Sequence, residues 1–371
     1  MTERPVRQAL VMCAALWMSA ACGGVSVSRP SESERLRVIL DTDANNELDD
    51  QHAIAYLLFN GDVFDVEGIT VNRTRGGGDV LQHRAEAERV VALAGLRGQM
   101  PVYTGADGSF EEIRKTLNEP GFDGAEAVNF IIRRARAADD RELLLLPVGK
   151  LTNIALALEK APDIEPRVRV VWLGSNYPEP GEYNQENDEP ALSYLLEQDV
   201  RFEIALVRYG QPSGTDAVRA SLEEIRRTMP GRGPRISPPV TGRHGDSFST
   251  FGDYSVSLFE HIELHGDPPS RALYDMAAVA IVKNPAWASA REIPAPRLVD
   301  GRWVDRPDNT RTIVLWEHFD RDAIMRDFYD RMEHVRPQAA HRPTRIRMPA
   351  TSASTAITGA GRPSATMPAS P

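Results

Sequence analysis

The sequence predicts an α/β protein: an open, mainly parallel but mixed sheet with helices on both faces, followed by a helical C-terminal part. Two observations predict this class. Short apolar runs rich in Val, Ile and Leu alternate with longer runs of helical periodicity, which is typical of a parallel sheet wrapped by helices. Several apolar runs are also followed directly by acidic or amide side chains, and ligand sites in such sheets lie outside the carboxyl ends of the strands.

The first unit of this pattern is residues 37–58, RVILDTDANNELDDQHAIAYLL. Its apolar run, residues 38–40, fits a strand buried on both faces. The apolar residues between 53 and 58 recur at helical spacing, and Asp49 or Asp50 suits the N-cap or first turn of that helix. This stretch therefore predicts a strand, an acidic loop and a helix in succession.

The later elements continue the alternation. Strands are expected at 63–72, 142–149, 168–175, 201–207 and 311–319. Helices are expected at 79–95, 125–137, 151–161, 189–198, 215–229, 247–264, 273–284 and 321–335. A Pro/Gly-rich joint at 231–240 separates the regular alternation from the more helical C-terminal part.

The acidic loop after the first strand holds Asp41, Asp43, Asp49 and Asp50. Four carboxylates so close together repel one another, so they either spread into water or share a cation. Ligands that are all oxygen favour a hard ion, calcium or magnesium. The alternative is an acidic loop that merely begins a helix.

Composition limits the classes of function. The 371 residues carry a formal charge of -10, and the pI of about 5.4 argues against a nucleic-acid-binding surface. The only cysteines, Cys13 and Cys22, lie near the N-terminus, so the main domain has neither a disulfide framework nor a cysteine-bound metal.

Residues 1–22 resemble a signal peptide: Arg4 and Arg7 precede an apolar run, and small residues lead to Cys22. The sequence before Cys22 resembles a bacterial lipobox, which implies a lipid anchor at that cysteine; soluble secretion is the alternative. We expect a periplasmic or membrane-anchored protein, with a flexible tether at 23–35, one domain at 36–335 and a disordered tail at 336–371.

Three later stretches accompany the aspartates in order: PVGKLTNIALAL (147–158), GSNYPEPGEYNQENDEPA (174–191) and RALYDMAAVA (271–280). Together with the Asp-x-Asp and the adjacent aspartates of the first loop, they resemble the nucleoside hydrolase family, the inosine-uridine type ribonucleoside N-glycosidases. The resemblance spans roughly residues 36–334 and implies a Rossmann-type sheet and a role in purine or pyrimidine salvage. It also implies a small nucleoside or N-riboside as substrate, and family members are commonly homo-oligomers.

The resemblance also implies roles for individual residues. It implies that calcium is bound by the carboxylates of Asp43, Asp50 and Asp275 and by the main-chain oxygen of Val148. It also implies that Asp43 takes a proton from the attacking water. The substrate-binding residues implied are Asp49 on the ribose 2'-hydroxyl and Asn176, Glu182 and Asn184 on the other hydroxyls. Asp41 supports the loop, and Asn153 is expected to begin a helix.

This chemistry is consistent with the demands of the reaction. Cleavage of an N-glycosidic bond passes through an oxocarbenium-like sugar, which needs a nucleophilic water and nearby negative charge. A carboxylate can take the proton of that water. Amide and carboxylate side chains can pair with vicinal hydroxyls as donors and acceptors.

The sequence departs from the family pattern at three places. Tyr274 stands where family members have the histidine proposed to protonate the leaving base, so it is the candidate at that position. Asn72 is the nearest counterpart of the family's asparagine after the second strand, although it is offset. The first loop is two residues longer, with Asn45, Asn46 and Glu47 in place of Pro-Gly.

Three other functions compete with this interpretation. A haloacid-dehalogenase-type phosphatase would use Asp41 and Asp43 as nucleophile and acid, and an EF-hand-like calcium loop would begin at Asp41. The EF-hand pattern fails because Asn46 and His52 stand where its glycine and glutamate belong. A non-catalytic nucleoside-binding lipoprotein would keep the metal and ribose site without the acid. His244 and His265 lie in the loop region near the expected site.

Overall fold

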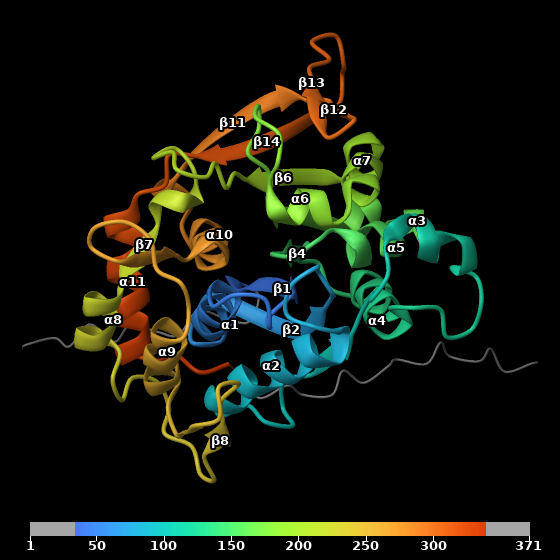
Figure 1. Cartoon of the computed structure of the whole chain (residues 1–371). Coiled ribbons are helices and arrows are strands. Elements are labelled where there is room, and N and C mark those ends of the chain that lie inside the picture. Colours follow the sequence, from blue (N-terminus) through green and yellow to red (C-terminus); the bar gives the residue numbers. More distant parts are fainter. Residues whose placement is uncertain (1–33, 339–371) are drawn as a thin grey trace, which may run out of the picture. The chain divides into compact units, whose positions relative to one another are not determined.

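The computed structural model describes residues 34–338 (Figure 1). The predicted signal peptide, Cys22 and nearly all of the predicted tether lie outside these residues, as does the predicted tail from residue 339. The domain itself extends three residues past the predicted boundary. Gln338 still packs on it, since its Nε2 donates to the carbonyl oxygens of Leu57 and Leu58.

The centre of the domain is an eight-stranded sheet in the order β11-β14-β6-β5-β4-β1-β2-β3. All neighbouring strands are parallel except β11, which is antiparallel to β14. The strands are β1 (Leu36–Thr42), β2 (Phe64–Val71), β3 (Val102–Thr104), β4 (Leu143–Pro147), β5 (Val168–Leu173), β6 (Arg201–Ala205), β11 (Ser289–Pro294) and β14 (Thr312–Glu317). The predicted mainly parallel, mixed sheet is therefore confirmed.

Helices cover both faces of the sheet because successive strand residues point to opposite sides. In β1, Val38 and Leu40 pack into one apolar cluster, whereas Ile39 packs into the other. The first cluster contains α1 (Asp49–Leu58), α2 (Val80–Leu93), α9 (Phe251–Glu260), α10 (Tyr274–Lys283) and α11 (Arg321–Glu333). The second contains α3 (Phe110–Ile113), α4 (Ala125–Ala135), α5 (Thr152–Lys160) and α7 (Glu189–Glu197).

The predicted helix at 215–229 is wrong in its first half. Residues Thr215–Ala217 form a 3-10 turn, Arg219–Ser221 form the short strand β7, and the helix α8 is Leu222–Thr228. The strand pairs antiparallel with β10 (Ser270–Ala272), and this tertiary pairing overrides the local helical pattern. Ser221 then caps α8 through its hydroxyl, which accepts from the Glu224 amide.

The C-terminal part is less helical than predicted. Ahead of α9, the short strands β8 (Val240–Thr241) and β9 (Ser247–Phe248) pair antiparallel, so the predicted helix at 247–264 is only Phe251–Glu260. Beyond α10, β11 completes the edge of the main sheet. A hairpin of β12 (Arg297–Val299) and β13 (Arg302–Val304) projects beside it (Figure 1). The sequence pattern missed these strands because all of them are short or largely exposed.

His52 lies fully buried in α1, between α9 and α11, with its Nε2 on the Ser255 hydroxyl and its Nδ1 on the Leu48 carbonyl oxygen. Burial lowers the pKa of His52 to about 4. The folded protein keeps the ring neutral while the unfolded chain takes up a proton below about pH 6.5. The stability contributed by neutral His52 is thus complete above about pH 6.5 and is lost as the pH falls toward 4.

We therefore expect His52 to lower the free energy of unfolding by up to about 3 kcal/mol between pH 6.5 and pH 4. Urea unfolding across this range, at fixed calcium, measures the slope. In His52→Gln the free energy of unfolding should fall by about 3 kcal/mol less over this pH range than it does in the wild type. An exposed control, His334→Gln, should keep the wild-type slope. Equal slopes in wild type and His52→Gln would contradict the prediction.

The strand order places a ligand site between β1 and β4. From β1 the chain continues to β2 and β3 on one side of it, whereas β4, β5 and β6 lie on the other. Such a reversal opens a crevice outside the carboxyl ends of the strands. Residues 43–49 and 148–151 leave β1 and β4 at this point.

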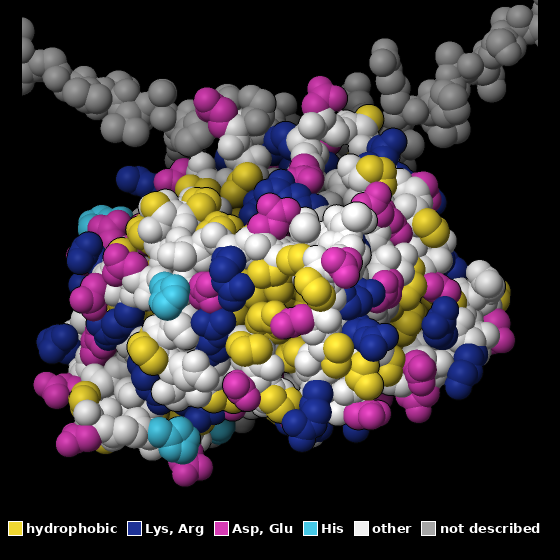
Figure 2. All heavy atoms as spheres, turned by 90° about the horizontal axis from the view of Figure 1, so that it is seen from above, with side chains coloured by type: hydrophobic (Ala, Val, Ile, Leu, Met, Phe, Trp, Pro, Cys, Tyr) yellow, Lys and Arg dark blue, Asp and Glu magenta, His cyan; other side chains and the backbone are white. Residues whose placement is uncertain are grey.

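The face shown in Figure 2 carries acidic and basic side chains interspersed around a central group of apolar ones. No broad basic patch is visible on that face, in line with the acidic composition. Within residues 34–338, no helix is both long and apolar enough to cross a membrane.

Candidate active site

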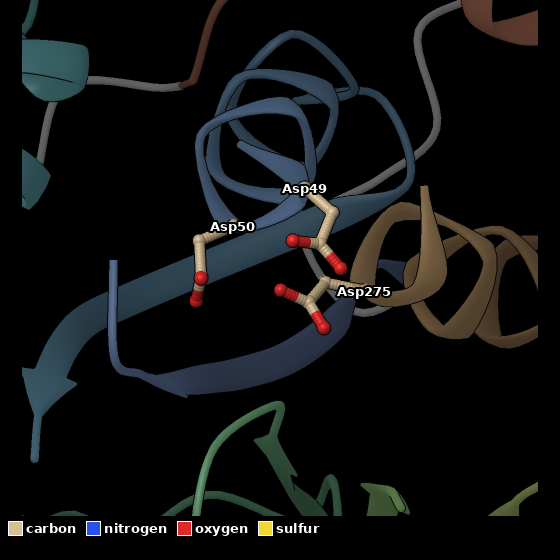
Figure 3. A group of neighbouring side chains, drawn as sticks. All are labelled: Asp49, Asp50 and Asp275. Atoms are coloured by element: carbon tan, nitrogen blue, oxygen red, sulfur yellow. The ribbon is translucent and has the colours of Figure 1, made fainter. Parts of the chain in front are cut away.

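Four buried aspartates converge at the carboxyl end of β1. Asp43 follows the strand, Asp49 and Asp50 begin α1, and Asp275 lies in the first turn of α10. Figure 3 shows the side chains of Asp49, Asp50 and Asp275 in one group, drawn from the two helix starts. One carboxylate oxygen of each of these three lies within 4.8 Å of the others.

The electrostatics of this cluster favour a bound cation. Burial raises the pKa of all four carboxyls, and their mutual repulsion raises those of Asp49, Asp50 and Asp275 further. The pKa of Asp49 rises to about 8. Keeping all four carboxylates ionised at neutral pH requires a compensating positive charge. Their all-oxygen donor set fits a hard metal ion. A metal ion can therefore be held by this buried cluster.

The resemblance assigned Asp43, Asp50 and Asp275 to the metal and Asp49 to the sugar. The structure brings Asp49 as close to Asp50 and Asp275 as a metal ligand would be. Asp43 contacts other groups, since it accepts hydrogen bonds from the Thr74 hydroxyl (2.5 Å) and the Asn46 amide (3.3 Å). All four line one pocket, and the division of roles among them stays a prediction.

Asp41 lies near the end of β1 and does not line this pocket. It is buried and accepts several hydrogen bonds. Its carboxylate accepts from the Thr70 hydroxyl at 2.6 Å and from the side-chain amides of Asn72 at 2.8 Å and Asn153 at 2.7 Å. Burial raises the pKa of Asp41 to about 7, against the opposing effect of these donors. Asp41 thus fixes the ends of β1 and β2 and the start of α5, which agrees with its expected supporting role.

Asn153 joins the same network from the first turn of α5. Its side-chain oxygen also accepts from the Ala106 amide, and its nitrogen donates to the Val71 carbonyl oxygen as well as to Asp41. It lies in the first turn of α5, as the sequence predicted, and its side chain joins the start of this helix to the ends of β1 and β2 and to the loop after β3.

The turn after β4 brings the backbone close to Asp43. A Cβ at Gly149 would lie 2.7 Å from Asp43 Oδ1, so only glycine fits this approach. The preceding residue, Val148, lines the pocket, and its carbonyl oxygen accepts from the Asn184 side chain at 2.7 Å. A carbonyl oxygen has two lone pairs and could still serve as a metal ligand.

The cavity has a volume of about 300 Å³, the lower end of the range for small-molecule sites. Its lining contains the predicted residues Asp43, Asp49, Asp50, Val148, Glu182, Asn184, Tyr274 and Asp275. Glu182 accepts from the backbone amides of Ser175, Asn184 and Gln185, which anchors its side chain beside the pocket.

Two predicted substrate-binding residues do not line the pocket. Asn72, which directly follows β2, donates its side-chain amide to Asp41 at 2.8 Å. Asn176 braces its own loop: its side-chain nitrogen donates to the Gly181 carbonyl oxygen, and its oxygen accepts from the Tyr209 amide. In this structure both side chains make supporting contacts, and their roles in substrate binding stay predictions.

Tyr274 lines the pocket, but its hydroxyl donates to Asp216 at 2.6 Å. Burial and this carboxylate hold the pKa of the Tyr274 hydroxyl far above its usual range. The proton is thus bound tightly and directed away to an acceptor. This contact does not support Tyr274 as the acid that protonates a leaving group.

The sequence interpretation did not assign several pocket residues. Arg271 and Glu47 form an ion pair in the lining, and Tyr183, Tyr209 and His265 complete its polar wall. The signals were present: Tyr183 stands between Glu182 and Asn184, and Tyr209 follows the end of β6. His244, by contrast, lies outside this pocket and stacks on His261.

Comparisons with known proteins identify the family. The family model described as inosine-uridine preferring nucleoside hydrolase matches residues 38–342. An inosine-uridine preferring nucleoside hydrolase from Crithidia fasciculata is 31% identical over 295 residues, which are 72% of this chain and 84% of that protein. The chain belongs to the nucleoside hydrolase family. It is thus a hydrolase of the N-glycosidase type, and the family's reaction is cleavage of the N-glycosidic bond of ribonucleosides.

Other relatives agree with this assignment. A pyrimidine-specific ribonucleoside hydrolase, RihB, from Escherichia coli is 26% identical over 281 residues, covering 70% of this chain and 82% of that protein. The solved structure of a purine-preferring ribonucleoside hydrolase from Gardnerella vaginalis has a TM-score of 0.58 at 18% identity. It covers 80% of this chain and 98% of that structure, so the fold of a nucleoside hydrolase is shared.

The phosphatase alternative is wrong on these grounds. The family model spans most of the chain, and Asp41, the required nucleophile, is held by three donors behind the pocket.

Proposed function

We propose that this protein hydrolyses the N-glycosidic bond of a ribonucleoside or related N-riboside, with calcium as its metal and Asp43 as the general base. The observation that carries the proposal is the meeting of four buried carboxylates with Glu182 and Asn184 in a single pocket. The carboxylates supply the negative charge that an oxocarbenium-like sugar requires. The side chains of Glu182 and Asn184 can form hydrogen bonds with ribose hydroxyls.

Calcium, when bound, supplies the positive charge that keeps the aspartates ionised and orients and acidifies a water molecule. Asp50, Asp275 and the Val148 carbonyl oxygen would hold it together with Asp43. The chain's own residues account for the remaining chemistry. Asp43, steadied by Thr74 and Asn46, takes the proton of the attacking water. Asp49 holds the 2'-hydroxyl.

A panel of ribonucleosides assayed for free base and for ribose, with calcium and with a chelator, tests the proposal. We expect hydrolysis that the chelator abolishes and added calcium restores. The matching 2'-deoxyribonucleosides should be poorer substrates because Asp49 then lacks its partner. Calorimetric binding of nucleosides without base release on long incubation would instead support the non-catalytic binding protein.

We also propose that the mature protein works outside the cytoplasm, either anchored through a lipid on Cys22 or soluble in the periplasm. The N-terminal sequence pattern supports this proposal. Mass spectrometry of the mature N-terminus tests it, and an unmodified N-terminus other than Cys22 would exclude the lipid anchor. A homo-oligomeric state likewise stays a prediction.

A further inference from the structure

The reaction needs a proton donor for the departing base, and Tyr274 does not fit that role. When the glycosidic bond breaks, its electron pair goes to a ring nitrogen of the base. The base then leaves as an anion unless an acid protonates it. The donor must reach the pocket and must not be committed to another partner.

Most polar groups that line the pocket are already committed. The Tyr274 hydroxyl donates to Asp216, Arg271 pairs with Glu47, and the Tyr209 hydroxyl contacts Glu182 at 3.4 Å. The Asn46 side-chain nitrogen donates to Asp43. These groups can shape the pocket, but each would have to break an existing interaction to serve as an acid.

His265 differs from these groups. It is the only histidine among the described residues that line the pocket. Its backbone is fixed, because its amide donates to the Ser270 carbonyl oxygen and its carbonyl oxygen accepts from the Ser270 amide, both at 3.0 Å. The Ser270 hydroxyl adds a third bond to the same carbonyl oxygen at 3.1 Å. Its ring, however, has no hydrogen bond or ion pair with any residue in the 34–338 range.

We propose that His265 is the catalytic residue that protonates the leaving base, in place of residue 274. This inference rests on the proposed function. As the bond between C1' and the base nitrogen breaks, the imidazolium of His265 gives its proton to a ring nitrogen of the base. Water adds to C1', Asp43 takes the water's proton, and the products are neutral base and ribose. Asp43 then releases its proton to solvent, and the neutral imidazole of His265 takes one up.

The experiment compares two ribosides that differ in their need for an acid: a natural ribonucleoside and 4-nitrophenyl β-D-riboside, whose phenolate leaves without protonation. The variants are His265→Gln, the rival Tyr274→Phe, and the control His244→Gln, which changes a histidine outside the pocket. In His265→Gln, we expect kcat for the nucleoside to fall by about 10²-fold or more, and kcat for the nitrophenyl riboside by less than about tenfold.

Four outcomes separate the possibilities. Equal losses on both substrates in His265→Gln, or no loss on either, would overturn the assignment. A selective loss in Tyr274→Phe would identify the tyrosine as the acid instead. A selective loss in His244→Gln would show that histidine removal in general has this effect. If the wild-type protein cleaves neither riboside, the proposed function itself fails. Melting temperatures of all variants check that each one folds.

Discussion

Replacing Asp43 with asparagine is expected to lower kcat for ribonucleoside hydrolysis by about 10²–10⁴-fold, the usual contribution of a general base. Asparagine has nearly the same shape as aspartate, and its side-chain oxygen can still accept from the Thr74 hydroxyl. The protein should therefore fold, but the amide cannot take a proton from water. Steady-state kinetics at saturating calcium measure the loss, and a calcium titration separates it from weaker metal binding.

Asp246→Asn is a suitable control, because Asp246 is exposed on the loop between β8 and β9 and does not line the pocket. It should retain the wild-type kcat. If Asp43→Asn keeps more than a tenth of the wild-type kcat at saturating calcium, Asp43 is not the general base.

Removal of calcium is expected to lower the melting temperature as well as the activity. A ligand present at 100 times its Kd stabilises the folded state by about 2.7 kcal/mol, which for a domain of about 300 residues corresponds to a shift of about 4 °C. The physical reason is the buried acidic cluster, whose carboxylates repel one another without a cation. Thermal unfolding with a chelator and then with excess calcium measures the shift.

Asp275→Asn sharpens this test because it deletes one charge from the cluster while keeping the side-chain volume. The variant should lose most of the calcium-induced shift. In chelator, it should melt at or above the temperature of the wild type, since less repulsion remains. A variant with the full wild-type shift would contradict the assignment of Asp275 as a ligand. Asp322→Asn, an exposed change at the start of α11, is the control.

Much of the fold could be predicted because the strands of the sheet centre are buried on both faces. The run containing Val38, Ile39 and Leu40 is continuously apolar, since its neighbours in the two core clusters leave no polar position. The same pattern could not predict β7, because the residues of this strand lie within a stretch whose apolar residues recur at helical spacing. Its pairing with β10 joins segments about fifty residues apart, and local periodicity carries no information about such a contact.

For the site, the sequence alone determined which acids stand at the end of the first strand and which later motifs accompany them. This was possible because their order and spacing are local. Only the tertiary structure decided which side chains face the pocket. It directed the side chain of Asn72 to Asp41 and that of Asn176 to the Gly181 carbonyl oxygen. It also joined Tyr274 to Asp216 and Arg271 to Glu47 of the longer first loop. Hydrogen-bond partners far apart in the chain direct these side chains, so their orientation depends on how the loops pack.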